Sequence, residues 1–218
     1  EQMDMDVTTL ETDRLILRQW RKTDYPIFAE LNADNQVMEY FPSLLSEDAS
    51  NAIADRCTSL TLTRGWGFWA VELKPIGEFI GFVGLHVPND RLPFSPCVEI
   101  GWRLAKQYWK NGYATEAASE ALTFAFETLN LKEVVLFTSV HNYPSRSVME
   151  RIGLLNTNQN FLQADIPKEH PLSQHVLYKI IKSGWQDNDD LKTSSDRADE
   201  PTVSYEKFLK VLSNNADV

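Results

Sequence analysis

Gly112 lies in a short polar segment directly ahead of a predicted helix, where backbone groups could bind a ligand. Residues 110–118 are K-N-G-Y-A-T-E-A-A. Because glycine has no Cβ, it leaves the backbone open where the chain enters the helix. The first N–H groups of a helix have no partner within it and point outward at the positive end of its dipole. This arrangement predicts an anion site, for which phosphate is the natural occupant.

Two regular elements are expected to position this segment. Residues 98–104 are rich in β-branched and aromatic side chains and end at a turn-prone Lys106-Gln107 pair, which predicts a strand. Further along, apolar residues recur at intervals of three and four and predict a helix over 112–129. These residues are Ala114, Ala118, Ala121, Leu122, Ala125 and Leu129. The predicted phosphate site therefore lies between a strand and the helix that follows it.

In this register, residues 98–118 resemble the acyl-CoA loop of the GCN5-related N-acetyltransferases (GNAT). The family pattern (R/Q)-x-x-G-x-(G/A) aligns with W-K-N-G-Y-A at 109–114, and only Trp109 departs from it. That departure is a variant found in the branch similar to the ribosomal-protein N-terminal (RimJ/RimL-like) acetyltransferases. The resemblance covers residues 8–181 and implies acetyl-CoA (coenzyme A) as co-substrate, with no metal. Six residues would hold its pyrophosphate: Lys110, Asn111, Gly112, Tyr113, Ala114 and Thr115.

The resemblance also implies the fold class: α/β, with a mixed, largely antiparallel central sheet flanked by helices. Its fourth and fifth strands are parallel and splay apart, and the pantetheine arm of the cofactor enters the gap. The sequence patterns are consistent with this order of elements. They predict strands at 14–20, 68–73, 78–87, 98–104, 133–140 and 175–181, and helices after Thr23 or Asp24 and at 46–65, 112–129 and 144–152. By resemblance, Trp102, Arg103 and Leu104 contribute backbone groups to the pantetheine arm.

A second segment that matches the family begins at Asn142. It is N-Y-P-S-R-S-V-M-E-R-I-G-L, which resembles N-x-x-S-x-x-(V/L)-x-E-x-x-G-(F/L). The resemblance implies that Asn142 contacts the pantetheine amide and that Ser145 lies near the thioester sulfur. As alternatives, Asn142 could form a turn and Ser145 a helix cap. Many relatives carry a tyrosine as general acid where this chain has Met149, which cannot donate a proton. Ser145 is then the next candidate acid, and Tyr143 a weaker one.

Glu99 is the candidate general base. An amine acceptor arrives as an ammonium ion and must lose a proton before it can attack, and a nearby carboxylate can accept that proton. Glu99 lies on the central strand where family members often carry this acidic residue. Glu99 could equally well have no catalytic role and be a half-exposed strand glutamate or the structural partner of an arginine. Glu72 and Glu39 are weaker candidates for the base.

The acceptor pocket is expected to involve Tyr40, Phe41, Trp66 and His170. His170 belongs to the segment I-P-K-E-H-P-L-S-Q-H-V-L-Y, which resembles one bacterial subgroup of the family. A histidine satisfied by the backbone is the simpler interpretation of either His170 or His175. A metal site formed by these two histidines is disfavoured, because no third ligand is evident nearby.

Composition limits the classes of protein to which this chain can belong. With 218 residues and a formal net charge of −10, it can bury a substantial core, and its charge argues against nucleic-acid binding. Two cysteines cannot build a disulfide framework, which predicts reduced thiols and a cytoplasmic location. No apolar run approaches the roughly 20 residues of a membrane helix, and the first residues lack the features of a signal peptide. We therefore expect no membrane partner; a homodimer is one expected assembly.

The predicted organisation is an acetyltransferase domain at 1–181, an acidic flexible linker at 182–200, and an amphipathic helix and tail at 201–218. The predicted activity is transfer of acetyl from acetyl-CoA to a primary amine by direct attack in a ternary complex. The branch resemblance favours a protein N-terminus as acceptor. The alternatives are a small-molecule amine (polyamine, amino acid or antibiotic) or a non-catalytic module that binds acyl-CoA, an option that Met149 keeps open.

Overall fold

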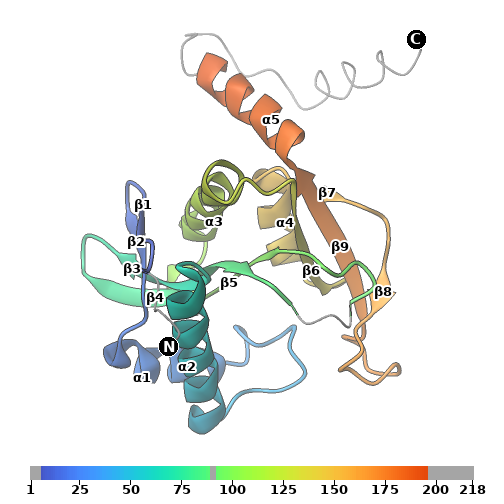
Figure 1. The fold of residues 1–218 in the computed structure, drawn as a ribbon. Helices are drawn as coiled ribbons and strands as arrows, with labels where there is room; N and C mark the ends of the chain where they lie inside the picture. The colour runs from blue at the N-terminus through green and yellow to red at the C-terminus, as the bar shows by residue number, and fades with distance from the viewer. Residues whose placement is uncertain (1–5, 89–91, 196–218) are drawn as a thin grey trace. The chain divides into compact units, whose positions relative to one another are not determined.

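The fold is organised around one mixed sheet. The computed structural model describes residues 6–88 and 92–195, and its contacts separate a first unit that ends at Lys182 from a second that begins at Ser183. The described strands of the first unit follow the order β1-β2-β3-β4-β5-β6-β9-β7, with β8 beside β9 (Figure 1). Of the neighbouring pairs, only β5 and β6 are parallel. This confirms the predicted α/β fold class with its largely antiparallel sheet.

The elements agree closely with those predicted. The strands are Leu10–Glu11 (β1), Leu15–Arg18 (β2), Phe68–Leu73 (β3), Glu78–His86 (β4), Glu99–Leu104 (β5), Glu133–Ser139 (β6), Leu155–Asn156 (β7), Phe161–Leu162 (β8) and Gln174–Ile181 (β9). The helices are Tyr25–Asn32 (α1), Glu47–Arg64 (α2), Tyr113–Thr123 (α3), Tyr143–Arg151 (α4) and Lys182–Ser195 (α5). Short 3-10 turns lie at Lys22–Asp24 and Lys106–Tyr108, and a π-helical turn at Phe124–Thr128 ends the predicted 112–129 helix.

The parallel strands β5 and β6 are joined at one end only. Glu99 and Val135 form their one ladder pair, and Val135 N donates to Val98 O at 3.0 Å. Beyond Glu99 the two strands diverge, although β5 stays paired with β4 along its whole length. The splay expected of the fourth and fifth strands is therefore present, here between β5 and β6 because the short β1 adds one strand to the count.

The two faces of the sheet are covered by different helices. Phe68, Phe82 and His86 share a face with Glu99, because directly opposite residues in antiparallel strands point to the same side. On that face, Phe82 packs against Phe28 of α1, with ring centroids 5.9 Å apart. The opposite face contains Trp69, whose ring meets Phe124 at the end of α3, 5.4 Å between centroids. Glu99 therefore faces the side of α1 and α2, away from α3.

A buried ionic network connects β2, β3 and the start of α1. Arg18 donates to both carboxylate oxygens of Asp24, at 2.9 and 3.0 Å, and its Nε donates to Glu72 at 2.7 Å. Asp24 also accepts from the Arg21 backbone N–H, at 2.7 Å. Asp24 is the N-cap residue of α1, but its side chain makes no capping hydrogen bond, because this network holds the carboxylate. Glu72 is likewise bound to arginine, which removes it as an alternative base.

The segment after β9 differs from its predicted conformation. Composition predicts a flexible acidic linker at 182–200, whereas Lys182–Ser195 forms α5. The polar composition of this segment indicates that it has little apolar surface to bury. A helix that is exposed to solvent does not need such a surface, so the composition did not exclude one. The amphipathic helix predicted at 201–218 lies outside the described residues.

Candidate functional site

The loop that precedes α3 presents backbone amides at the helix start. Gly112 has φ 80° and is the N-cap residue, and the first helical hydrogen bond runs from Glu116 N to Gly112 O at 3.0 Å. The N–H groups of residues 113–115 precede that bond and so have no helical partner. Lys110 also has a positive φ, 62°, so the chain turns tightly ahead of the helix. The predicted anion site thus has the expected backbone geometry.

Trp109, the one departure from the family pattern, anchors this loop. Its indole Nε1 donates to Leu104 O at the end of β5, at 2.9 Å. The Asn111 side-chain amide donates to Tyr108 O and Trp109 O, at 3.2 and 2.9 Å. The predicted cofactor residue Asn111 therefore shapes the loop with its side chain. Trp109 occupies the position of arginine or glutamine in the family pattern. Hydrogen bonds from the Trp109 and Asn111 side chains to backbone carbonyls hold the loop in place.

Sequence reasoning missed Arg14, which lies beside the same loop. Its Nε donates to Glu116 at 2.7 Å, and its guanidinium carbon lies 4.5 Å from the Tyr113 ring centroid. A Cβ placed on Gly112 would lie 3.5 Å from Arg14 Nη2. Only the tertiary fold brings this cation to the helix start, because Arg14 is about a hundred residues away in sequence. It places a guanidinium, paired with Glu116, beside the predicted anion site.

The backbone of β5 divides its groups between β4 and the gap. Ala105 N donates to Ile80 O of β4 at 2.9 Å, whereas Val98 O accepts from β6. Because these groups alternate sides along a strand, Trp102 and Leu104 turn their backbone groups toward the gap and Arg103 turns its own toward β4. We therefore retain Trp102 and Leu104 as candidate backbone donors to a ligand in the gap. For Arg103, the expected backbone contribution to the pantetheine arm does not fit this geometry.

The start of α4 lies at the end of β6. The Asn142 side chain is buried; it accepts from Ser145 N at 3.3 Å and donates to Thr138 at 2.9 Å. The Ser145 hydroxyl makes no hydrogen bond within residues 6–88 and 92–195. Met149 is fully buried. Asn142 is therefore the helix cap, whereas the alternative considered above gave that role to Ser145, and the Ser145 hydroxyl is the polar group left available at this helix start.

Glu99 is a half-buried carboxylate, and it has no ion pair with any residue in the described part of the chain. Burial raises the pKa of Glu99 to about 8. His86 lies directly opposite on β4, and burial, together with the nearby Arg64 and Arg56, lowers the pKa of His86 to about 4. At neutral pH the imidazole is therefore neutral. The alternative of Glu99 as a structural partner of an arginine is wrong, and a carboxyl with a pKa near working pH suits a general base.

The Arg103 side chain lies on the same face as Glu99. Its Nη1 donates to Asn32 of α1 at 2.8 Å, and its guanidinium lies 4.2 Å from the Phe41 ring centroid. Arg103 Nε is buried and has no hydrogen-bond partner among the described residues. Arg103 thus holds Phe41, a predicted acceptor residue, against the face of the sheet that carries Glu99.

The other predicted acceptor residues are more scattered. Tyr40 is half-buried in the connection between α1 and α2, and burial raises its pKa. Trp66 lies 5.7 Å from the Arg64 guanidinium, directly after α2. His170 accepts from Leu172 N at 3.1 Å in the turn before β9, which fits the backbone-satisfied alternative. Of the four, the structure associates Phe41 most directly with the Glu99 face.

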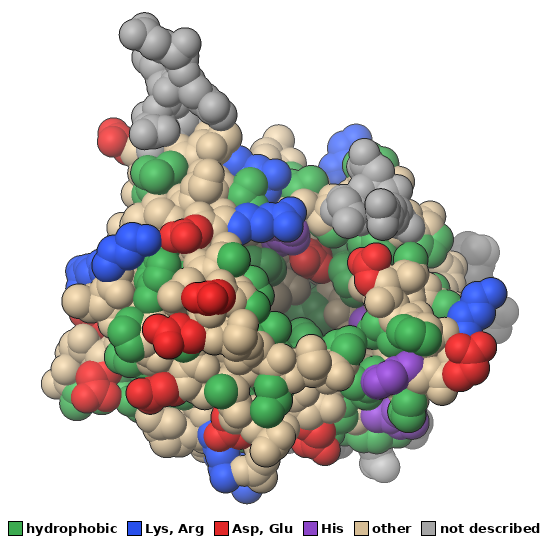
Figure 2. All heavy atoms as spheres, turned by 90° about the horizontal axis from the view of Figure 1, so that it is seen from below, with side chains coloured by type: hydrophobic (Ala, Val, Ile, Leu, Met, Phe, Trp, Pro, Cys, Tyr) green, Lys and Arg blue, Asp and Glu red, His purple; other side chains and the backbone are tan. Residues whose placement is uncertain are grey.

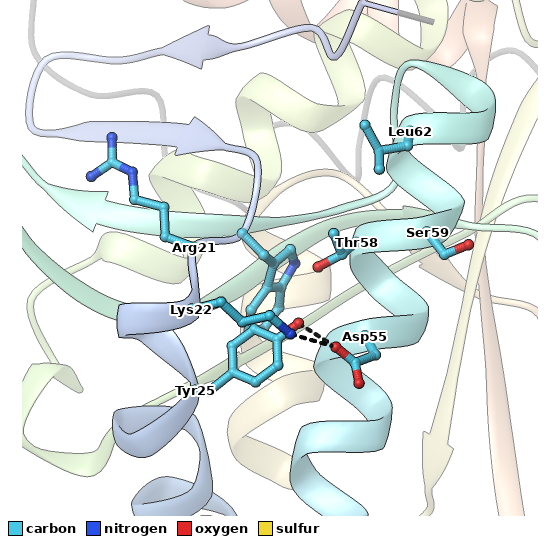
Figure 3. A pocket seen from close by; sticks show the side chains of 8 residues that line it. Arg21, Lys22, Tyr25, Asp55, Thr58, Ser59 and Leu62 are labelled. Carbon is cyan, nitrogen blue, oxygen red and sulfur yellow. Dashed lines mark hydrogen bonds and ion pairs between the residues drawn. The ribbon is translucent and has the colours of Figure 1, made fainter. Parts of the chain in front are cut away.

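Two cavities flank α2. One, of about 240 Å³, contains Lys22 and Tyr25, both bound to Asp55 at 3.0 and 2.7 Å (Figure 3). Lys22 is paired with Asp55 inside the cavity, and the other cation of its wall, Arg21, is paired with Glu72 at 3.2 Å, so the cavity offers little to a charged ligand. The other, of about 180 Å³, lies between α2 and β3–β4 and includes His86 in its wall. Glu99 does not line this second cavity, but it lies directly opposite His86, which does.

Seen from the side of α1 and α2, the molecule is hollowed near the centre of the face (Figure 2). Hydrophobic side chains line most of the hollow, and acidic, basic and histidine side chains gather at its edge. Within the described ranges, no cluster of three or more His, Cys, Asp or Glu residues could hold a metal ion. No helix among those residues combines the length and the apolar character needed to cross a bilayer.

Comparison with known proteins gives consistent matches. The family model described as "Acetyltransferase (GNAT) domain" matches residues 14–155. The N-acetyltransferase YnaD of Bacillus subtilis is 27% identical over 177 residues, 81% of this chain and 98% of the relative. FsC-acetyl coenzyme A-N(2)-transacetylase of Aspergillus fumigatus is 32% identical over 184 residues, 81% of this chain and 77% of the relative. RimL, a ribosomal L7/L12 α-N-protein acetyltransferase solved with coenzyme A, shares the fold at a TM-score of 0.63 and 17% identity, over 81% of this chain and 99% of its own.

Proposed function

Because the chain belongs to the GNAT family of N-acetyltransferases, we propose that it moves an acetyl group from acetyl-CoA to a small-molecule primary amine, with Glu99 as general base. The family prediction made from residues 109–114 and 142–154 is confirmed, and with it the enzyme class. The observation that carries the proposal is a half-buried carboxylate, Glu99, that has no ion pair among the described residues and lies where β5 and β6 diverge.

The residues present fit acetyl-CoA, which supplies an activated thioester when bound. The amides of residues 113–115 suit a pyrophosphate, because helix N-terminal N–H groups and the helix dipole both favour an anion. Arg14, paired with Glu116, lies beside them and could contribute further N–H donors. Past Glu99, the edge of β5 that faces the gap offers an extended arm the backbone groups of Trp102 and the N–H of Leu104, whose carbonyl oxygen already accepts from Trp109.

In this mechanism Glu99 removes a proton from the acceptor ammonium, directly or through one water. The pKa of Glu99, about 8, lets the carboxylate form near neutral pH and still bind a proton firmly. The backbone N–H of Trp102, which points into the gap, stabilises the negative charge that develops on the acyl oxygen. Ser145 at the start of α4 can donate to the departing thiolate, a step that buried Met149 cannot perform.

Two considerations bear on the acceptor. The relative that is 32% identical is named for transfer to N(2) of FsC, which supports a small-molecule amine. The likeness to RimL supports a polypeptide N-terminus, the acceptor first expected from the sequence. We place the small molecule first, because RimL is similar in fold at only 17% identity.

A direct test measures thiol release from acetyl-CoA with a panel of free amines and N-terminal peptides. Turnover that requires an amine is the expected result, with small amines the better substrates. A preference for peptides would reverse the order of the two acceptor classes. Tight coenzyme A binding without turnover of any panel member would instead identify a non-catalytic acyl-CoA-binding module, and the proposal would be abandoned.

Replacing Gly112 with valine is expected to weaken coenzyme A binding by about tenfold or more. A β-branched residue is strained at φ 80°, so the loop must change conformation and turn its amides away from the anion. The nearest atom to a new Cβ is 3.5 Å away, an ordinary contact, so the effect comes from the backbone and not from a clash. Isothermal titration of coenzyme A measures it.

Gly77→Val is the matched control. Gly77 also has a positive φ, 66°, with nothing within 4 Å of its added Cβ, and it lies in the β3–β4 turn. Both variants should lose similar stability, about 1–2 kcal/mol. Equal coenzyme A affinity in the two variants would show that the loop before α3 does not bind the cofactor.

A further inference from the structure

The cavity between α2 and the β3–β4 hairpin is lined by positive charge. Arg56 and Arg64 project from α2, and His86 belongs to β4. The rest of the wall is mainly apolar and includes Leu60, Phe68 and Leu85. No carboxylate is among its lining residues in the described part of the chain, although the protein as a whole carries a net charge of −10.

These arginines have no acidic partner in the part of the chain that the structure describes. Neither Arg56 nor Arg64 forms an ion pair with a residue in 6–88 or 92–195, and Arg64 makes one ring contact, with Trp66 at 5.7 Å. Arg64 Nη1 is buried and lacks a hydrogen-bond partner among those residues. A buried donor without an acceptor is costly, and in native structures it is usually explained by a bound group. Arg18, in contrast, has its positive charge paired with the carboxylates of Asp24 and Glu72.

The cavity also adjoins the proposed site of chemistry. His86 contributes to its wall and is the direct cross-strand neighbour of Glu99. Directly opposite residues in such a pair have Cβ atoms about 5 Å apart. A molecule held in the cavity can therefore extend past His86 and bring an amine to the Glu99 carboxylate.

We propose that this cavity binds an anionic group of the acceptor, so that the preferred substrate is a small amine that also carries a carboxylate or phosphate. The inference rests on the proposed function and names its substrate class. The arginine guanidinium binds oxyanions through paired N–H donors, and the apolar wall accommodates a hydrocarbon part between the anion and the amine. A neutral His86 can donate one further hydrogen bond.

The test compares acceptors that differ in the anion, leucine against leucinamide and O-phosphoserine against serine, with each rate corrected for the unprotonated fraction of the amine, because the anion also changes the amine pKa. Wild-type protein is expected to prefer the anionic member of at least one pair by about tenfold or more in kcat/KM, since a charge-assisted hydrogen bond is of that size. The pair that shows the preference identifies the anion as carboxylate or phosphate.

Arg64→Gln should reduce that preference about tenfold, mainly through a higher KM for the anionic acceptor, as expected for a lost charge-assisted contact. Arg64→Lys should restore part of it, because the charge returns without the paired donors. Lys22→Gln is the matched control: it removes a cation from the other cavity beside α2, where Asp55 already pairs with it, and should leave the preference unchanged.

A binding measurement separates this inference from the proposed function. The product analogue N-acetyl-leucine, titrated into protein saturated with coenzyme A, should bind the wild type and bind Arg64→Gln more weakly, whether or not turnover is seen. Equal kcat/KM within both acceptor pairs, or a preference that survives both Arg64→Gln and Arg56→Gln, would overturn the anion subsite and leave the acetyltransferase proposal standing. If no acceptor is turned over but N-acetyl-leucine still binds the wild type and binds Arg64→Gln more weakly, the acetyltransferase proposal would be overturned and the anion subsite would stand.

Discussion

Replacing Glu99 with glutamine is expected to lower kcat by about 10²–10⁴-fold, the usual contribution of a general base. The wild-type rate should rise with pH, reach half of its plateau near pH 8 and level off about one unit higher, because burial raises the pKa of Glu99 to about 8 and only the carboxylate accepts a proton. The acceptor in this experiment should be an amine with a pKa of about 10.4, which stays mostly protonated over this pH range, so that ionisation of the amine does not set the pH at which the rate levels off. Steady-state kinetics from pH 6 to about 9 measures both effects.

Stability measurements guard against loss of folding in this variant. The folded-state pKa of Glu99 lies above the unfolded value of 4.5, so ionisation of Glu99 opposes folding. The free energy of unfolding is therefore highest, as far as Glu99 is concerned, below pH 4.5, where the carboxyl is protonated in both states. It falls as pH rises from 4.5 to about 8 and does not change further above that pH. Glu99→Gln avoids this cost and should be more stable than wild type at high pH, by more than about 1 kcal/mol.

Glu133→Gln, at the start of β6, is the control for Glu99→Gln. Glu133 is a strand glutamate paired with Lys179 at 3.2 Å, and it lies outside the proposed machinery. The control should keep both its rate and the rise in rate toward pH 8. A Glu99→Gln protein with near-wild-type kcat, or with the same rise toward pH 8, would remove Glu99 from the base role.

Replacing Arg18 with methionine is expected to destabilise the fold by roughly 3–5 kcal/mol, the range found when one member of a buried ion network is removed. Arg18 is buried and is bound to Asp24 and Glu72, so the substitution leaves two carboxylates without their main cationic partner. Urea unfolding monitored by tryptophan fluorescence gives the change in the free energy of unfolding.

Two further variants define the mechanism of the Arg18 effect. Lys22→Met removes an exposed cation from its pair with Asp55 and should change stability little, because such pairs are screened by solvent. Replacing Arg18, Asp24 and Glu72 together with Met, Asn and Gln should recover most of the loss, since no carboxylate stays buried without a counter-charge. Wild-type stability in the single variant would show that the network does not hold β2, β3 and α1 together.

Much of the fold could be predicted from the sequence, because its signals are local. Periodicity and turn residues predicted α2 from Ser46 to Gly65, where a serine cap and a glycine at φ 79° define the ends. The segment around Gly112 likewise predicted a loop and helix start whose amides are free to bind an anion. Each conclusion depends on residues a few positions apart, whose spacing the sequence itself gives.

The sequence could not predict which charged side chains form ion pairs or lie close together. Glu72 was a candidate base until the fold paired it with Arg18, and Arg14 reached the start of α3 only through the packing of β2. The direction of the Arg103 side chain, the burial of Glu99 and the unmatched arginines beside His86 follow from strand register and helix placement. The sequence by itself determined the family, the order of elements and the candidate phosphate-binding segment. Only the tertiary structure decided which carboxylate is half-buried without an ion pair among the described residues, because burial and pairing depend on residues far apart in the chain.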